Sequence, residues 1–394
     1  MIFQTLDTKK ECAGIYVSGK IVREAPPDDL TATWKYTPHL QLPVEYANLY
    51  CAGRSIGEMC PAEIREQWDA SNTRLQSFIN ACTVAKVDLE QNCFFDLVPQ
   101  EFLLQYCDLR NRITEHVIEK YPKPKNYNFL LDLVKLLGGI GTRDMNVDPR
   151  LLAKYAALPR ARALYKKLKN RSSHRVDYCP FKSKTGRLTT SKPSFPILTL
   201  DRVFRSIVKP TNDYFIELDF NAAELRTLLA LSGKSQPPED IHDWNLKNVY
   251  KGAGTRETAK KRIFAWLYNP ESNDYLSDRA YSRDEVLKKY FDGRQVTTVF
   301  EREIPADRHH ALNYIIQSTT SDLLLKRAIE IDKILYNRRS NVAFLLHDSL
   351  IIDFSKEDNE LLSSLVEIFS CTDLGRYLAN VSVGKDFGSM RRYR

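Results

Sequence analysis

The stretch that decides the fold is Leu218-Asp219-Phe220-Asn221-Ala222-Ala223-Glu224-Leu225-Arg226. It contains the end of the apolar run Tyr214–Phe220, which predicts a buried strand, and residues 224–231 predict the start of a helix. An aspartate at the end of a buried strand lies at a sheet edge, where its carboxylate can face a ligand. Phosphoryl transfer depends on in-line positioning and on cations, with little covalent help from the protein. Asp219 is therefore a candidate metal ligand.

A second carboxylate lies in the triplet His347-Asp348-Ser349, between the apolar runs 342–346 and 350–354. These runs predict a hairpin. A polar triplet between apolar strands costs free energy unless its groups are paired or bound to a metal. Two aspartates from different strands can hold two Mg²⁺ ions at the ~3.5–4 Å separation of a two-metal site. For either aspartate taken alone, a cap or a turn is the simpler interpretation.

Between the two aspartates, Arg256, Lys260, Phe264 and Tyr268 recur at four-residue steps. In a helix, four residues advance about 400°, so the four side chains form one stripe that drifts by about 40° per step. A guanidinium and an ammonium can bind phosphate oxygens, and the two rings offer a surface for a sugar and a base. The alternative is an amphipathic surface helix with solvated charges.

Together these blocks resemble the polymerase core of the A-family DNA polymerases, the DNA polymerase I type, in a compact, phage-like form. Residues 219–226 match the first palm motif D-x-S-x-x-E-L-R, residues 256–268 match the fingers helix R-x₃-K-x₃-F-x₃-Y, and His347-Asp348 matches the start of H-D-E. The resemblance covers roughly residues 155–394. Further matches keep the same order: Thr185-Gly186-Arg187-Leu188, Asp240-Ile241-His242, Asn313 with Gln317, and Val383-Gly384-Lys385.

The resemblance implies an α+β fold, the right-hand polymerase, with an antiparallel-sheet palm, helical fingers and thumb, and a small N-terminal domain. The expected regions are an N-terminal domain of unknown role (1–95), a helical thumb-like region (96–178), a first part of the palm (179–235), shortened fingers (236–309) and a second part of the palm (310–394).

The implied function is a template-directed DNA polymerase that adds dNTPs to a primer 3′-OH by two-metal nucleotidyl transfer. Its cofactors would be two Mg²⁺ ions, with Mn²⁺ able to substitute. Its partners would be a DNA primer-template and dNTPs, with a processivity factor or other replication proteins in addition, and no membrane.

The resemblance also implies a role for each matching residue. The catalytic metal ligands are Asp219, Asp348 and the backbone carbonyl of Phe220. The residues that bind the dNTP are His242, Arg256, Lys260, Phe264, Tyr268 and Glu224. Glu224 also packs against Tyr268 and blocks a ribose 2′-OH. The residues that contact primer and template are Arg187, Asn313, Gln317 and His347.

The chain departs from the family pattern at several positions. Ser349 stands where the family usually has Glu, and Asn221-Ala222 replaces the usual Ser-Gln of the first palm motif. Ala265 and Asn269 replace glycines of the fingers helix. Single-subunit RNA polymerases carry H-D-S, which keeps an RNA polymerase or primase as an alternative, although Glu224 argues against it. A catalytically inactive subunit that binds primer-template is a third hypothesis, and Ser349 is its motivation.

The charge distribution favours a polyanionic partner. Residues 151–210 hold 15 Lys and Arg against 2 Asp and Glu, whereas residues 1–100 hold 9 against 13. Like charges at that density repel one another unless a polyanion neutralises them, so this segment is a candidate track for a nucleic-acid backbone. A solvated basic face is the alternative.

Other segments predict structure without chemistry. Residues 15–22 predict a short strand and residues 61–83 a helix. Residues 99–168 predict a helical region in which Gly138, Gly139 and Gly141 end one helix, and residues 311–335 predict a long helix interrupted at most near Ser318. The 8 Cys include no C-x-x-C pair, which indicates reduced thiols.

Two absences complete the expectations from sequence. The D-x-E pattern Asp88-Leu89-Glu90 resembles an exonuclease metal site, but too few residues surround it for such a domain, so we expect no proofreading exonuclease. The N-terminal residues have no apolar core of signal-peptide length, and no run approaches the ~18 residues of a membrane span. We therefore expect a cytoplasmic protein, including a viral protein in a host cytoplasm.

Overall fold

The computed structural model describes residues 4–7, 12–24, 26–36, 38, 40, 42–89, 92–171, 173–191 and 194–393. Glu90 of the D-x-E pattern lies outside these residues. The chain divides into two compact units, Met1–Arg143 and Asp144–Arg394. The division falls inside the region 96–178 that we expect to be thumb-like, so the five-region division stays a prediction.

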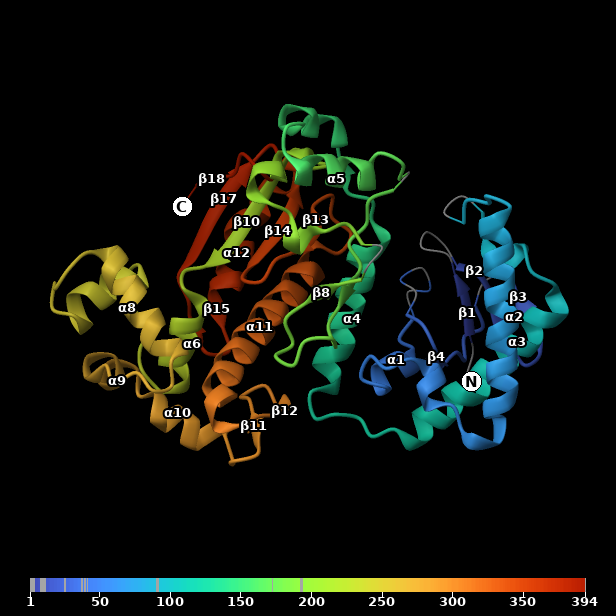
Figure 1. The fold of residues 1–394 in the computed structure, drawn as a ribbon, viewed down its shortest axis with the longest axis horizontal. Helices are drawn as coiled ribbons and strands as arrows, with labels where there is room; N and C mark the ends of the chain where they lie inside the picture. Colours follow the sequence, from blue (N-terminus) through green and yellow to red (C-terminus); the bar gives the residue numbers. More distant parts are fainter. Residues whose placement is uncertain are drawn as a thin grey trace. The chain divides into compact units, whose positions relative to one another are not determined.

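The first unit combines small sheets with long helices (Figure 1). Its three-stranded antiparallel sheet has the order β1-β2-β3. Its strands are β1 (Gln4–Asp7), β2 (Cys12–Val17), β3 (Lys20–Val22), β4 (Ala32–Thr33) and β5 (Glu45–Tyr46). Its helices are α1 (Ala47–Tyr50), η1 (Ile56–Met59), η2 (Ala62–Ile64), α2 (Arg65–Val84), η3 (Phe94–Asp96), α3 (Gln100–Lys120) and α4 (Tyr127–Thr142).

One expectation for this unit is wrong, and another is right in part. Residues 15–22 form two strands of a hairpin, because Ser18 and Gly19 both have positive φ and turn the chain between them. Helix α4 continues through Gly138 and Gly139 and ends at Thr142, directly after Gly141. A Cβ at Gly138 would lie 2.6 Å from the Tyr36 ring, so this glycine allows the helix to pack closely on an aromatic side chain.

The second unit is built on a five-stranded sheet of order β13-β14-β10-β17-β18, whose neighbouring strands are all antiparallel. Its strands are β10 (Tyr214–Phe220), β13 (Asn341–Leu345), β14 (Ser349–Phe354), β17 (Ala379–Gly384) and β18 (Arg391–Arg392). The predicted strand and hairpin are confirmed. Helices α11 (Arg308–Leu335) and α12 (Leu362–Ser370) pack against each other and against the sheet. Helix α11 is uninterrupted at Ser318.

Side chains alternate between the two faces of β10. Phe220 stacks on Phe369 of α12, with ring centroids 4.2 Å apart. Phe215 lies five residues earlier and contacts Phe344 instead, with ring centroids 5.7 Å apart. Because side chains alternate along a strand, Glu217 and Asp219 share the face of Phe215, opposite the face that packs on α12. This face carries the candidate site.

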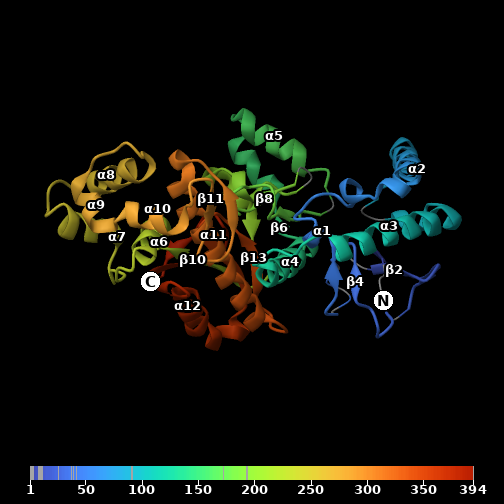
Figure 2. The same cartoon turned by 90° about the horizontal axis from the view of Figure 1, so that it is seen from below.

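A helical group lies beside α6 (Ala223–Leu231) in both Figures 1 and 2. It comprises α7 (Ile241–Trp244), η7 (Asn245–Val249), α8 (Arg256–Tyr268), α9 (Tyr275–Tyr281) and α10 (Arg283–Tyr290), followed by the hairpin of β11 (Gln295–Thr297) and β12 (Glu303–Pro305). One apolar cluster joins α6, α8, α10 and α11, and Ile263, Trp266 and Ile315 are at most 1% exposed within it.

The remaining elements lie before β10 and between β14 and β17 along the chain. Residues 144–210 contain β6 (Asn146–Val147), η4 (Pro149–Tyr155), α5 (Pro159–Leu168), β7 (Tyr178–Cys179), β8 (Thr189–Thr190), η5 (Ile197–Thr199), η6 (Arg202–Ile207) and β9 (Val208–Lys209). Residues 356–376 add η8 (Lys356–Leu361), β15 (Cys371–Thr372) and β16 (Gly375–Arg376).

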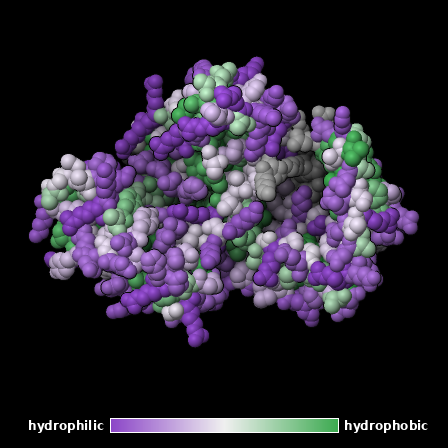
Figure 3. Space-filling model, in the orientation of Figure 1, coloured by the Kyte–Doolittle hydropathy of each residue, from purple (hydrophilic) through white to green (hydrophobic). Residues whose placement is uncertain are grey.

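Hydrophilic side chains cover much of the surface around α5, at the top of the view in Figure 3. Seven cysteines with described side chains are free thiols. Within the described ranges, none of the helices combines the length and the apolar character that a membrane crossing requires.

Candidate active site

The sheet brings the two predicted aspartates to neighbouring strand ends. Asp219, next to last in β10, pairs across the sheet with Ser349, the first residue of β14. Asp348 immediately precedes Ser349, in a turn closed by the hydrogen bond that Leu346 N donates to Ser349 O at 2.9 Å. His347 and Asp348 are exposed in this turn. Antiparallel pairing thus places both carboxylates at the same end of the sheet.

The charge around Asp219 favours a cation. Burial raises the pKa of Asp219 to about 7, and the negative charges of Asp348 and Glu217 act in the same direction. Asn380, opposite Asp219 on β17, donates a hydrogen bond to its Oδ2 at 3.1 Å, which lowers the pKa. Carboxylates that repel one another gain free energy when a divalent ion binds between them.

The donor set fits magnesium. Mg²⁺ takes one or two protein carboxylates and completes its octahedron with substrate phosphates and waters. Asp219 and Asp348 supply two hard oxygen donors, and the carbonyl of Phe220 would add a third. Among the described residues, no group of three or more His, Cys, Asp or Glu side chains could hold a metal ion. Any metal chemistry here would therefore depend on the aspartate pair and the substrate.

The predicted basic-aromatic stripe lies on α8. Thr255 begins this helix with a capping box that it shares with Thr258. The side buried in the unit consists of Ala259, Ile263, Trp266 and Leu267. On the other side, Lys260 and Tyr268 are exposed, whereas Arg256 and Phe264 are partly buried.

An aromatic surface forms along this stripe. The rings of Phe264 and Tyr268 stack with centroids 5.9 Å apart and an interplanar angle of 9°. The His242 ring lies 5.7 Å from Phe264. His242 is 4% exposed, and its Nδ1 has no hydrogen-bond partner among the described residues. Burial lowers the pKa of His242, which favours the neutral imidazole.

Glu224, in the first turn of α6, connects the sheet region to α8. Arg187 Nη2 donates to its Oε1 at 2.7 Å, and the Tyr268 hydroxyl donates to its Oε2. Burial raises the pKa of Tyr268, and the hydrogen bond to Glu224 raises it further. The contact between Glu224 and Tyr268 that the resemblance implies is thus present. Because both oxygens of Glu224 are bonded, its side chain has a defined position.

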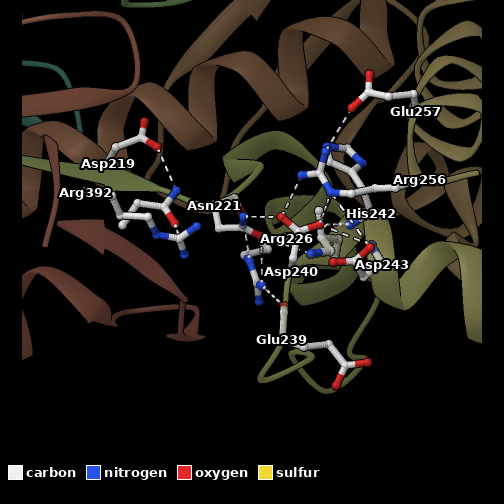
Figure 4. A network of polar contacts seen from close by, with 12 residues as sticks. Asp219, Asn221, Arg226, Glu239, Asp240, His242, Asp243, Arg256, Glu257 and Arg392 are labelled. Atoms are coloured by element: carbon white, nitrogen blue, oxygen red, sulfur yellow. Dashed lines mark hydrogen bonds and ion pairs between the residues drawn. The ribbon is translucent and has the colours of Figure 1, made fainter. Parts of the chain in front are cut away.

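Arg256 is bound to Asp240 in a network that reaches the end of β10 (Figure 4). Its Nε and Nη2 donate to the two oxygens of Asp240 at 3.2 and 2.9 Å. Asn221 donates to Asp240 Oδ2 at 2.9 Å, and the backbone amides of His242 and Asp243 donate to Oδ1. Although burial acts in the opposite direction, the hydrogen bonds from Arg256 and Asn221 hold the pKa of Asp240 far below its usual range.

The network joins three elements that are separate in the sequence. Asn221 is the second residue after Asp219, Asp240 caps α7, and Arg256 begins α8. The position of α8 is therefore coupled to the strand end that carries Asp219. Sequence reasoning placed Arg256 on a triphosphate and missed Asp240 as its partner.

Arg226 is a second residue that sequence reasoning left without a role. Its side chain is fully buried, and its guanidinium donates to four oxygens between 2.7 and 3.2 Å away. Two of these belong to Asn221, and the others are the carbonyls of Pro237 and Glu239. Arg226 therefore fixes the segment before Asp240 against the end of β10. The position of Arg226 at the end of the matched palm motif was the sequence signal that could have indicated this structural role.

The loop with Arg187 is braced by a buried ion pair. Arg302 donates to both oxygens of Asp322 at 2.9 and 2.6 Å, and Asp322 is fully buried on α11. Ser321 donates to the carbonyl of Gly186 at 3.2 Å. A Cβ at Gly186 would lie 2.6 Å from the Arg302 guanidinium carbon. This close approach requires glycine next to Arg187.

Asn313 and Gln317 lie on the side of α11 that approaches this loop. They precede Ser321 by two turns and one turn, so the three side chains form one stripe. Both are partly buried. Asn313 Oδ1 is buried and has no hydrogen-bond partner among the described residues. The structure thus brings the side of α11 that carries Asn313 and Gln317 next to the Arg187 loop.

Gly186→Ala should destabilise the protein by about 2–4 kcal/mol, because it adds a Cβ at a left-handed residue and against Arg302. The φ of Gly186 is +74°. Gly233→Ala is the matched control, since Gly233 has a φ of +70° and open space around the added Cβ. Urea unfolding measures both. Equal losses in the two variants would show that the contact with Arg302 contributes nothing.

One sizeable cavity among the described residues lies away from these site residues. It has a volume of about 1090 Å³ and lies between the 234–238 segment, α12 and β17. None of the predicted site residues lines it.

No family model and no curated protein matches the sequence. The structure, however, is similar to the POL domain of Pol1 from M. smegmatis, solved in complex with a DNA primer-template and a dNTP. The TM-score is 0.62 over 88% of this chain and 82% of that chain, at 12% sequence identity. The chain has the right-hand polymerase fold. The predicted fold class is therefore confirmed, with an antiparallel palm sheet of the kind found in a Pol I-type polymerase domain.

Proposed function

We propose that this protein is a DNA-templated DNA polymerase that adds dNTPs to a primer 3′-OH and has no proofreading exonuclease. The observation that supports this most is the pairing of Asp219 with Ser349, which places Asp219 and Asp348 at one end of the palm sheet. Such a carboxylate pair on a right-hand polymerase fold suits nucleotidyl transfer. The similar polymerase domain of M. smegmatis was solved with primer-template and dNTP, the same substrates that we propose here.

The chemistry would take place beside the two aspartates. Two Mg²⁺ ions, with Mn²⁺ able to substitute, would when bound activate the primer hydroxyl and offset the charge on the leaving pyrophosphate. Asp219, Asp348 and the carbonyl of Phe220 would hold these ions. The bond that forms joins the primer 3′-oxygen to the α-phosphorus, and the bond that breaks joins that phosphorus to the bridging oxygen of pyrophosphate.

The incoming dNTP would lie along α8. Lys260 is exposed and offers its ammonium to the phosphates. Arg256 contributes positive charge nearby, although Asp240 already binds its Nε and Nη2. His242 adds a further polar group to the same site. The stacked rings of Phe264 and Tyr268 provide the surface for the sugar and base.

The primer-template would contact the Arg187 loop and the stripe of Asn313 and Gln317, with His347 beside Asp348. The basic segment 151–210 would follow the phosphate backbone, since clustered Lys and Arg bind it largely independently of sequence. A compact, phage-like replication enzyme in the cytoplasm, assisted by a processivity factor, belongs to the same proposal.

Glu224 favours deoxynucleotides over ribonucleotides. Its carboxylate is held by Arg187 and Tyr268 next to the expected sugar site. A side chain that cannot move aside excludes an added 2′-hydroxyl by size. This observation supports a DNA polymerase over an RNA polymerase or primase.

Primer extension tests the proposal directly. The purified protein, a labelled primer on a DNA template, dNTPs and Mg²⁺ should give products longer than the primer. Reactions with NTPs, with an RNA template and without a primer distinguish the RNA polymerase and primase alternatives. Binding of primer-template without extension under Mg²⁺ or Mn²⁺ would establish the inactive-subunit alternative and refute the proposal.

Phe264→Tyr should increase termination by dideoxynucleotides by about tenfold, because the added hydroxyl supplies a polar contact that a sugar without a 3′-OH lacks. The ratio of ddNTP to dNTP incorporation in a primer-extension ladder measures this effect. Phe291→Tyr adds the same hydroxyl to a partly buried ring outside the stripe and serves as the control. An unchanged ratio for Phe264→Tyr would count against placing the sugar beside Phe264.

A further inference from the structure

Ser349 is an uncharged residue at a position where the family that the sequence resembles usually has a glutamate. It follows Asp348, faces Asp219 across the sheet and is 2% exposed. The family that the sequence resembles usually carries a third carboxylate at this position. Because a serine hydroxyl has no charge, the pair Asp219 and Asp348 has one negative charge fewer beside it than that pattern provides.

A third carboxylate nevertheless lies near this position and comes from another strand. Glu217 is on β10, two residues before Asp219, so both side chains project from the same face of the sheet. Ser349 Oγ donates a hydrogen bond to Glu217 Oε1 at 3.2 Å. The directly paired neighbours of Glu217 are Ile351 on β14 and Ser382 on β17, so Ser349 is its diagonal neighbour.

Sheet register connects Glu217 to the aspartate pair. Asp219 pairs directly with Ser349, and Glu217 lies two residues before Asp219 on β10, so the side chains of Glu217, Asp219 and Ser349 project from one face of the sheet. Glu217 therefore lies on the same face as Asp219, beside the turn that carries Asp348.

The contacts of Glu217 do not favour a role as the counter-ion of Arg205. Within the described part of the chain, Arg205 Nε is buried without a hydrogen-bond partner. The Arg205 guanidinium lies over the ring of Phe387, 4.5 Å from its centroid. The hydrogen bond of Glu217 goes to Ser349 instead. Glu217 is thus directed toward the turn that carries Asp348.

We propose that Glu217 is a positioning residue for the metal site. Its carboxylate, which is hydrogen-bonded to Ser349, replaces the negative charge that the family usually carries at position 349. The inference rests on the proposed function. Glu217 acts in two ways: it holds Ser349, and with it the turn of Asp348, against β10, and its charge attracts cations to the aspartate pair. Asp219 and Asp348 remain the direct ligands.

Metal binding without turnover tests this role. Mn²⁺ binding to the full-length protein with primer-template and a non-hydrolysable dNTP analogue is followed by electron paramagnetic resonance. Glu217→Gln should weaken Mn²⁺ binding by about tenfold, because groups that support metal ligands typically contribute this much to affinity. The affinity for primer-template should stay the same. Glu330→Gln on exposed α11 surface is the control, since Glu330 is bonded there to Lys333 at 3.2 Å.

Exchanging the side chains of Glu217 and Ser349 distinguishes the effect of the negative charge from an effect on folding. Glu217→Ser/Ser349→Glu keeps the composition and moves the carboxylate to β14, so its Mn²⁺ affinity should lie within about threefold of the wild type. The double variant also provides the test if Glu217→Gln does not fold. Wild-type affinity in Glu217→Gln, or tenfold weaker binding in a folded exchange variant, would overturn the inference. A wild type that binds Mn²⁺ but extends no primer would instead refute the proposed function.

Discussion

Asp219→Ala should lower the rate of primer extension by about a thousandfold or more, because a metal ion contributes several kcal/mol of transition-state stabilisation and each 1.36 kcal/mol is a factor of ten. Asp219 is partly buried beside Asn380 and faces the turn that carries Asp348. The loss of its carboxylate would remove one of the two side-chain ligands that we propose for the metal ions. Asp348→Ala should have an effect of similar size. Single-turnover extension with saturating dNTP and Mg²⁺ measures both.

The control for this experiment is Asp213→Ala. Asp213 lies just before the opposite end of β10, where it accepts a hydrogen bond from Lys356 N at 2.8 Å. Its removal tests whether the loss of a carboxylate near this strand is enough to impair activity. The control should extend primers at close to the wild-type rate. Extension by Asp219→Ala within about tenfold of the wild type would contradict a metal role, since that loss corresponds to only about 1.4 kcal/mol.

Glu224→Ala should lower the preference for dNTPs over NTPs by about a hundredfold, which is the discrimination that a steric contact of one group typically provides. The side chain is held in place by Arg187 and Tyr268. Its removal opens space for a 2′-hydroxyl and also releases the Tyr268 hydroxyl. The ratio of kcat/KM for a dNTP to that for the matching NTP measures the effect.

Two further variants make the result specific. Glu239→Ala removes an exposed carboxylate of the same unit and should leave the ratio of kcat/KM for dNTP and NTP unchanged. The contact of Glu239 with Arg226 is made by its backbone carbonyl, which the substitution keeps. Tyr268→Phe keeps the ring and removes the hydrogen bond to Glu224. If positioning by Tyr268 matters, this variant should discriminate less than the wild type. A preference for dNTPs that survives in Glu224→Ala would show that another group excludes the ribose.

The local elements could be predicted from sequence because their signals are local. The apolar run at 214–220, the alternation around His347-Asp348-Ser349 and the periodicity of 256–268 all gave elements that the structure confirms. Antiparallel pairing of β10 with β14 then follows the expected palm arrangement. This pairing and the turn between β13 and β14 place Asp219 and Asp348 at the same end of the sheet, as the resemblance implied.

Other features depend on contacts between distant segments. Gly138 and Gly139 were interpreted as helix terminators, yet α4 continues to Thr142, and a Cβ at Gly138 would lie 2.6 Å from the Tyr36 ring. Arg256 was expected to face a triphosphate, and its partner Asp240 could not be inferred because the pair forms only when α7 and α8 pack together. Arg302 and Asp322 likewise meet only in the folded unit.

The sequence by itself determined the strand that carries Asp219, the turn that carries Asp348 and the stripe on α8, since each depends on hydrophobic periodicity and matched motifs within one segment. Only the tertiary structure decided how the charges are partnered. Glu217 reaches Ser349 because sheet register makes them diagonal neighbours, and Asp240 ties Arg256 to the end of β10. Register and packing are set by the whole core, so no single segment encodes these contacts.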